Sequence, residues 1–292
     1  MAPPGCSSSI RSGPGRNCRA STTCFAEVLV NLGAPQPVGG FRGWPAVPDG
    51  SGAVGRHLYV WLYLTMTPHV RRYHAARGIP DVISWTTLGE LGAEMTSTRS
   101  MYGASGLQWQ WALPLVFRGA FYRLGRLAFD RATISFTDPP LQPGASAIYT
   151  HIPEGGRLSP ADCDESFARA RTFFPRHFDD NPVAFLCSSW LMDDQLAAYL
   201  PEESNLIRFQ RRFRLLPNPG DTSDKTILDF VFHRLHDERD IQPSVLDTLP
   251  QDTTLQRAYV TRLRAGHHWR SRTGWFPLHN RPAAPAEFAG IR

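Results

Sequence analysis

Two adjacent glycines and an arginine lie between a predicted strand and a predicted helix. The strand is a short β-prone run over residues 148–152, and Gly155, Gly156 and Arg157 follow it. Glycines let the backbone approach a ligand closely, and amide groups before a helix N-terminus attract phosphate groups. Arg157 can add a charge-assisted hydrogen bond, and Ser159 is a typical N-cap residue. The segment therefore indicates a site for a nucleotide-type cofactor, although a Gly-Gly pair before a helix can also be a simple turn.

A histidine, His151, ends the strand that precedes this loop. Imidazole has an ordinary pKa of about 6.5, so His151 can supply a general base at neutral pH. A hydrogen bond from His151 to the loop backbone is the alternative interpretation. Cys187 could act as a nucleophile, but it follows an apolar run, and cysteine is among the most buried residue types. We therefore expect Cys187 to be a small core residue.

The other polar groups do not predict a metal site. The five cysteines include no CxxC pair and no zinc-ligand spacing. His267 and His268 are adjacent, so on a strand they would point to opposite faces and could not easily bind one ion. Glu90 and Glu94 lie one helical turn apart and could form a carboxylate pair, although a solvated helix face is the commoner arrangement. We expect no metal.

The glycine loop belongs to an alternation of strands and helices. Ser159, Pro160 and Asp162 supply an N-cap, a first-turn proline and a first-turn acid, which predict a helix directly after the loop. Alternation over residues 122–136 predicts an antiparallel meander before it. Further strands are expected over residues 183–187, 205–209 and 268–276, and further helices over 195–200, 226–235 and 253–265.

The first 115 residues or so lack this alternation and are predicted to be mostly helical. Residues 56–77 carry apolar side chains at near-helical spacing, although Pro68 must kink or restart the helix. Another helix is expected from Asp81 or Ser84 onward, with Gly103 as its stop signal. An apolar periodic segment covers residues 25–32.

The composition predicts a globular, mildly basic protein. Hydrophobic residues make up 42 % of the 292 positions, enough to fill real cores, and the net charge is +5. The basic residues are scattered, and only Lys225 is a lysine, which indicates a coding bias rather than a nucleic-acid partner. The sequence contains neither a membrane-spanning apolar run nor the apolar stretch of a signal peptide, so we expect no membrane partner and a cytoplasmic location. Residues 1–24 are expected to be a disordered leader, and residues 283–292 a tail.

Several short motifs are distributed along the chain: Phe117-Arg118-Gly119, Leu124-Gly125-Arg126-Leu127, His151-Ile152-Pro153, Phe173-Phe174, Cys187-Ser188-Ser189-Trp190-Leu191, Ser204-Asn205-Leu206, Phe209-Gln210-Arg211-Arg212-Phe213, Thr254-Leu255-Gln256-Arg257-Ala258 and Arg272-Thr273-Gly274-Trp275-Phe276. With these motifs and this order of elements, residues 25–280 resemble an actinobacterial family of acyltransferase-domain proteins. Such proteins pair a helical N-acyltransferase N-terminal domain with a GNAT-like C-terminal domain.

The resemblance implies an α+β fold. A helical domain over residues 25–118 would pack on a GNAT-like mixed, mostly antiparallel sheet with flanking helices over residues 119–282. The implied function is that of an acyl-CoA-dependent acyltransferase, an enzyme that moves an acyl group to an amine or hydroxyl of a small-molecule acceptor. A non-catalytic acyl-CoA or metabolite sensor with the same fold is the alternative, and a scaffold without coenzyme is a third possibility.

The resemblance also implies roles for particular residues. His151 would be the general base, and Tyr199 would protonate the departing thiolate, unless Tyr199 only packs. Backbone groups of Thr150 and Ile152 would bind pantetheine, and the pyrophosphate would bind the loop, through Gly155, Gly156, Arg157 and Ser159. The usual loop reads Arg or Gln, two residues, Gly, one residue, Gly or Ala. Glu154 begins the corresponding loop here, which departs from that pattern.

Overall fold

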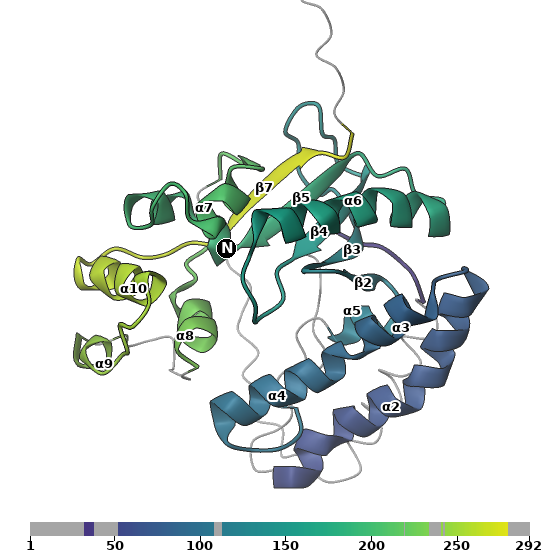
Figure 1. The fold of residues 1–292 in the computed structure, drawn as a ribbon, viewed down its shortest axis with the longest axis horizontal. Helices are drawn as coiled ribbons and strands as arrows, with labels where there is room; N and C mark the ends of the chain where they lie inside the picture. Colours follow the sequence, from purple (N-terminus) through teal and green to yellow (C-terminus); the bar gives the residue numbers. More distant parts are fainter. Residues whose placement is uncertain are drawn as a thin grey trace, which may run out of the picture.

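A computed structural model of the chain describes residues 32–37, 52–107, 113–218, 220–233, 241 and 243–279. The predicted leader, the predicted tail and all but the last residue of the apolar segment at 25–32 lie outside these residues. The described residues form an α+β fold with one open sheet and helices packed around it (Figure 1).

Within the described residues, the sheet has seven strands. The order is β1-β3-β4-β5-β7-β6, and β2 pairs with β3 as well. The β1–β3 and β4–β5 pairs are parallel, and the other pairs are antiparallel, which confirms the predicted mixed, mostly antiparallel sheet. The strands are β1 (Gln36–Pro37), β2 (Phe121–Leu124), β3 (Leu127–Thr133), β4 (Ser146–His151), β5 (Ala184–Ser189), β6 (Arg214–Leu215) and β7 (Arg272–Pro277).

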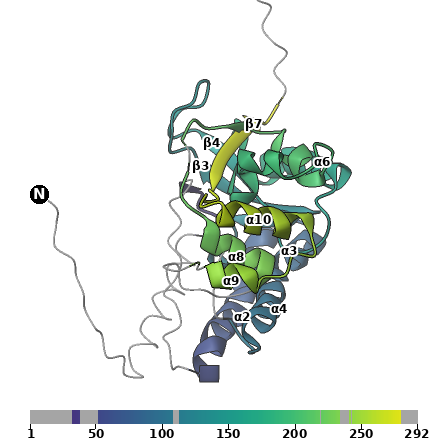
Figure 2. The same ribbon diagram turned by 90° about the vertical axis from the view of Figure 1, so that its left-hand side faces the viewer.

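The helices form three groups around the sheet. Figures 1 and 2 show α6 across one face of the sheet, α2 to α4 beside the β2 end, and α8 to α10 near the start of β7. The bounds are α2 (Gly52–Ala76), α3 (Asp81–Leu88), α4 (Glu90–Tyr102), α5 (Leu113–Phe117), α6 (Pro160–His177), α7 (Asn205–Gln210), α8 (Asp224–Phe232), α9 (Pro243–Asp247) and α10 (Thr254–Arg264), with short 3₁₀ helices η1 (Trp190–Met192) and η2 (Asp194–Ala198).

The prediction of a strand over residues 205–209 is wrong, because these residues form α7. Ser204 caps the helix, and its hydroxyl accepts a hydrogen bond from the amide of Ile207 at 3.3 Å. Ile207 packs in the core under α8 to α10, whereas Phe209 packs in the core under α6. Because this short helix lies between two cores, side chains two positions apart are both buried. Their spacing in the sequence is the same as that of buried residues on one face of a strand.

Other element boundaries differ from the prediction as well. The helix expected from Asp81 or Ser84 to Gly103 is divided at Gly89 into α3 and α4, whereas α2 is one helix with Pro68 inside it, so of the two predicted effects of Pro68 a restart is absent. The strand expected from residue 268 begins only at residue 272. Two backbone amides just before β7 donate to carboxylates, that of Trp269 to Asp224 at 2.9 Å and that of Arg270 to Asp193 at 2.8 Å.

The two faces of the sheet pack against different cores. Tyr122, Phe129 and Phe185 face α6 and form one aromatic core with Phe167 and Phe174 of that helix. On the β2–β3 side, Phe121 and Ala128 face the other way and pack with the helical N-terminal part of the chain. This alternation along β2, β3 and β4 decides which side chains share a face with His151.

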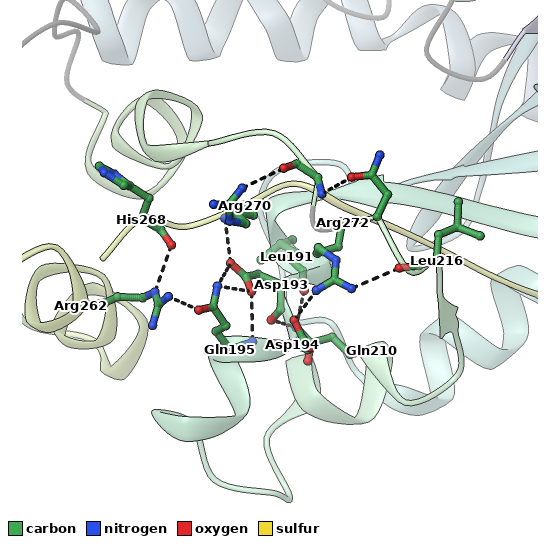
Figure 3. Close-up of polar contacts among 12 residues, drawn as sticks. Leu191, Asp193, Asp194, Gln195, Gln210, Leu216, Arg262, His268, Arg270 and Arg272 are labelled. Atoms are coloured by element: carbon green, nitrogen blue, oxygen red, sulfur yellow. Dashed lines mark hydrogen bonds and ion pairs between the residues drawn. The ribbon is translucent and has the colours of Figure 1, made fainter. Parts of the chain in front are cut away.

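A buried carboxylate joins the η1–η2 segment to the residues just before β7 and, through Gln195, to α10 (Figure 3). Asp193 is fully buried and accepts hydrogen bonds from the backbone of Arg270 at 2.8 Å and of Gln195 at 3.1 Å. The Gln195 side chain also donates to Asp193 and accepts from Arg262. Asp193 thus holds Arg270 directly and α10 through Gln195, although these segments are distant in sequence.

We predict that Asp193→Ala lowers the free energy of unfolding by about 2–4 kcal/mol, because it leaves buried donors without an acceptor. The matched control is Asp194→Ala. Asp194 is more than half exposed and forms an ion pair with Arg272, so its removal should cost about 0–1 kcal/mol. Urea denaturation measures both. Equal losses would contradict the role assigned to Asp193.

Candidate active site

His151 lies at the end of β4 and is hydrogen-bonded to a buried aspartate on β3. The His151 Nε2 atom is 2.8 Å from Oδ1 of Asp130, whose side chain is 6 % exposed. The β3–β4 register places Asp130 opposite Tyr149 and Ala128 opposite His151. All four residues therefore lie on one face of the sheet, and the histidine and aspartate meet diagonally.

The surroundings of His151 fix the orientation of its ring. Phe121 and Tyr149 contact the imidazole, each with ring centroids 4.9 Å from it. A carboxylate can only accept a hydrogen bond, so Asp130 favours the tautomer with the proton on Nε2. Nδ1 then carries a lone pair, the arrangement that a general base requires.

The parallel strands β4 and β5 separate next to His151. Their register consists of Ile148 opposite Phe185 and Tyr149 opposite Leu186, and β5 then continues along β7 alone. Thr150 and His151 therefore lie beyond the last β4–β5 pair. Thr150 is buried, and its hydroxyl oxygen has no hydrogen-bond partner within the described residues.

The side chain of Tyr149 connects the two strands across this separation. Its hydroxyl donates to the carbonyl oxygen of Ser188 at 2.9 Å and accepts from the Ser188 amide at 3.1 Å. Burial raises the pKa of Tyr149, so the phenol remains protonated at physiological pH. The Tyr149 hydroxyl thus bonds backbone groups of β5 at a position where β4 no longer pairs with that strand.

The glycine loop after β4 is exposed to solvent. Gly155 and Gly156 adopt φ values of 79° and 69°, a region that favours glycine, and a side chain on Gly155 would meet open space. Arg157 is also exposed. The Ser159 hydroxyl caps α6 and accepts from the amide of Asp162 at 3.5 Å. The predicted strand, glycine loop and capped helix are therefore all present in order.

Arg126, from outside the loop, and Glu154, its first residue, bond the loop to other parts of the chain. The Arg126 guanidinium, from the β2–β3 turn, donates to carbonyl oxygens of the loop. The Glu154 carboxylate contacts the Ser97 hydroxyl on α4 at 3.1 Å and His233 after α8 at 3.4 Å. The loop is thus joined to the helical N-terminal part of the chain and to α8.

The carboxylates near Glu154 influence one another. Glu94, on α4, has its pKa raised to about 7 by burial and by the charges of Glu90 and Glu154. Glu90 itself forms an ion pair with Arg123 at 2.7 Å, so the predicted Glu90–Glu94 pair is not a plain solvated helix face.

Tyr199 and Cys187 lie in packed surroundings. The Tyr199 ring contacts Trp269, with centroids 5.6 Å apart, and belongs to the core of α8 to α10, whereas His151 contacts Phe121 and Tyr149. Cys187 is buried, and burial raises the pKa of its thiol to about 12. The thiol therefore stays protonated and suits the predicted core role rather than that of a nucleophile.

Sequence reasoning missed the supporting roles of Asp130 and Arg126. Asp130 is an acid inside an otherwise apolar, alternating strand, which is a signal in itself because a buried carboxylate needs a partner. Its partner depends on the β3–β4 register, and that register is a property of the folded sheet.

Two family models match adjacent parts of the chain. The model described as N-acyltransferase N-terminal domain matches residues 18–119, and the model described as GNAT-like C-terminal domain matches residues 121–276. The chain belongs to this family of GNAT-like acyltransferases. The predicted pair of domains is confirmed, and the division at residue 118 stays a prediction.

Solved structures of acyltransferases are similar to the chain over most of its length. One is a complex with CoA and 10C-teicoplanin, with a TM-score of 0.77, and another holds decanoyl-CoA and teicoplanin, with a TM-score of 0.76. A third is a tryptophan-to-alanine mutant with octanoyl-CoA, at a TM-score of 0.77. Each is 36 % identical to this chain, covers 92 % of it and is itself covered to 81 %. Comparison with curated proteins gave no match.

The predicted function is confirmed at the level of the reaction. The chain is an acyltransferase that uses an acyl-CoA donor. Among the described residues, none of the helices is both long and apolar enough to cross a membrane, and no group of side chains is suited to a metal ion.

We predict that Glu94→Gln stabilises the protein at pH 8 but not at pH 4. Because the folded-state pKa of about 7 lies above the ordinary 4.5, ionised Glu94 destabilises the fold increasingly as pH rises from 4.5 to 7. The gain in unfolding free energy should be roughly 1–3 kcal/mol above pH 7. Melting temperatures at both pH values measure it, with the exposed Glu165→Gln as control. An equal effect of Glu94→Gln at both values would contradict the raised pKa.

Proposed function

We propose that the protein transfers a medium-length acyl group from acyl-CoA to an amine of a small-molecule acceptor, with His151 as general base and Asp130 as the residue that orients it. The observation that carries this proposal is the 2.8 Å His151–Asp130 hydrogen bond beside the point where β4 and β5 separate. The amine acceptor is supported by the match to an N-acyltransferase N-terminal domain.

The acyl-CoA in this proposal lies along the end of β4. Backbone groups of Thr150 and Ile152 bind pantetheine, because this part of β4 has no β5 partner. The loop residues Gly155, Gly156 and Arg157 bind the pyrophosphate, and the capped N-terminus of α6, with Ser159, adds its dipole. The thioester then lies near His151, which ends the same strand.

The acyl transfer needs one group that accepts a proton from the attacking nitrogen and one group that donates a proton to the thiolate. As the acceptor nitrogen attacks the thioester carbonyl carbon, Nδ1 of His151 takes its proton, and Asp130 stabilises the imidazolium that forms. The carbon–sulfur bond then breaks, and the thiolate takes up a proton. Tyr199 is our proposed donor for that proton, with the His151 imidazolium as the alternative.

Teicoplanin is our proposed first acceptor to assay, with octanoyl-CoA and decanoyl-CoA as first donors. The similar acyltransferase structures contain these compounds. Acceptors of this size would reach His151 from the sheet face that Phe121 shares with it, next to the helical N-terminal part of the chain.

We predict that His151→Ala lowers kcat at pH 7 by about 10²–10⁴-fold while the affinity for acyl-CoA stays close to that of the wild type. Asp130→Asn should lower kcat in the same direction, because an amide no longer stabilises the imidazolium. Steady-state kinetics and calorimetric binding of octanoyl-CoA measure the two effects.

The matched control is His268→Ala, which removes a second histidine–aspartate pair. His268 Nδ1 lies 2.6 Å from Asp224, but the histidine side chain is 64 % exposed and lies just before β7. This variant should keep full activity. Wild-type kcat in His151→Ala would contradict the base assignment, and acyl-CoA binding without turnover on any amine would contradict the proposed amine acceptor.

We further predict that Tyr199→Phe lowers kcat if its hydroxyl protonates the thiolate, since the variant keeps the ring that packs on Trp269. Pre-steady-state release of the thiol, followed with a thiol reagent, measures this step. Unchanged release would assign the proton to the His151 imidazolium and leave Tyr199 as a packing residue.

A further inference from the structure

We propose that Arg126 is the positioning residue that gives the glycine loop its phosphate-binding shape. This inference rests on the proposed binding of the acyl-CoA pyrophosphate at that loop. Arg126 comes from the β2–β3 turn, about 30 residues before the loop in the sequence, and no short motif links the two.

The guanidinium of Arg126 is bonded to three backbone carbonyl groups of the loop. Its Nη1 donates to Pro153 at 2.9 Å, its Nε to Arg157 at 3.0 Å and its second Nη to Gly156 at 3.3 Å. One side chain therefore contacts the loop before, within and after its glycine pair. A planar fork of donors suits this task, whereas the three protons of a lysine originate from a single nitrogen.

The turn that carries Arg126 is itself attached to α6. The Ser166 hydroxyl of α6 accepts from the amide of Leu127 at 3.2 Å and donates to the carbonyl of Asp162 at 2.7 Å. A side chain at Gly125, where φ is 94°, would come within 2.9 Å of that hydroxyl. The turn is thus packed closely against the first turns of α6, so Arg126 and the helix N-terminus are held in one unit.

These contacts have an electrostatic consequence for an anion. Carbonyl oxygens carry partial negative charge and would repel a phosphate, but the three carbonyls in question face a permanent cation. Amide groups of the loop and the exposed Arg157 remain available on the solvent side. The positive charge of Arg126 adds to the potential there without requiring direct contact with the ligand.

The contacts of Glu154 make the role of Arg126 more specific. The Glu154 carboxylate bonds Ser97 and His233 rather than Arg126. The negative and the positive side chain at the loop therefore have different partners, and Arg126 is the one that bonds the glycine segment.

The test compares donors with and without the pyrophosphate. Octanoyl-CoA and octanoyl-pantetheine share the thioester, but only the first carries the pyrophosphate and the nucleotide. Arg126→Met and Arg126→Lys should raise the Kd and KM for octanoyl-CoA by about tenfold or more, while kcat and the KM for octanoyl-pantetheine stay close to wild-type values. Arg126→Lys keeps the charge and should show the smaller effect.

Arg169→Met is the matched control, because it removes an exposed arginine of α6 that pairs with Glu165 and donates no bond to the loop. Unchanged octanoyl-CoA affinity in both Arg126 variants overturns the inference, as does an equal rise for both donors, which would indicate general packing. If Arg126→Met does not fold, Arg126→Lys decides alone. If the wild type binds both donors equally well, the loop does not bind pyrophosphate, and the proposed coenzyme site fails together with this inference.

Discussion

The separation of β4 from β5 after Tyr149 is the constraint on which the candidate site depends. Two strands that pair only at Ile148 and Tyr149 leave the end of β4 without a partner on one edge. That edge would be costly in a buried sheet, because backbone amides and carbonyls need hydrogen-bond partners. Tyr149 bonds the backbone of Ser188 on the opposite strand, and in the proposed function the end of β4 pairs with the pantetheine of the acyl-CoA. The same short stretch carries His151, so donor binding and proton transfer would share one strand.

The site is built from segments that the fold holds in place by polar networks as well as by apolar cores. Asp130 joins β3 to His151, and Asp193 joins the η1–η2 segment to Arg270, just before β7. Both are buried carboxylates with defined donors, which fits the rule that a buried charge must be paired. The aromatic core under α6 supports the other face of the sheet and contains Phe129 and Phe167. His151 and Asp130, the residues of the proposed catalytic pair, lie on the opposite face of the sheet.

The order of elements could be predicted because it depends on local signals. A Ser159 cap with Pro160 and Asp162 specifies the start of α6 wherever it occurs, and Thr253 with Gln256 does the same for α10. The wrong prediction, a strand at residues 205–209, has a tertiary cause. Ile207 and Phe209 of α7 pack in two different cores. Their alternating spacing therefore results from contacts on two sides of a helix and not from one buried face of a strand.

The sequence by itself determined that a histidine ends a strand before a glycine loop and a capped helix, because each of these features is encoded within a few adjacent residues. Only the tertiary structure decided which groups act on that histidine and on that loop. Asp130 reaches His151 through strand register, and Arg126 reaches the loop carbonyls from a turn in another part of the chain. Such contacts depend on how strands pair and how helices pack, and single-residue preferences carry no information about distances between segments remote in the sequence.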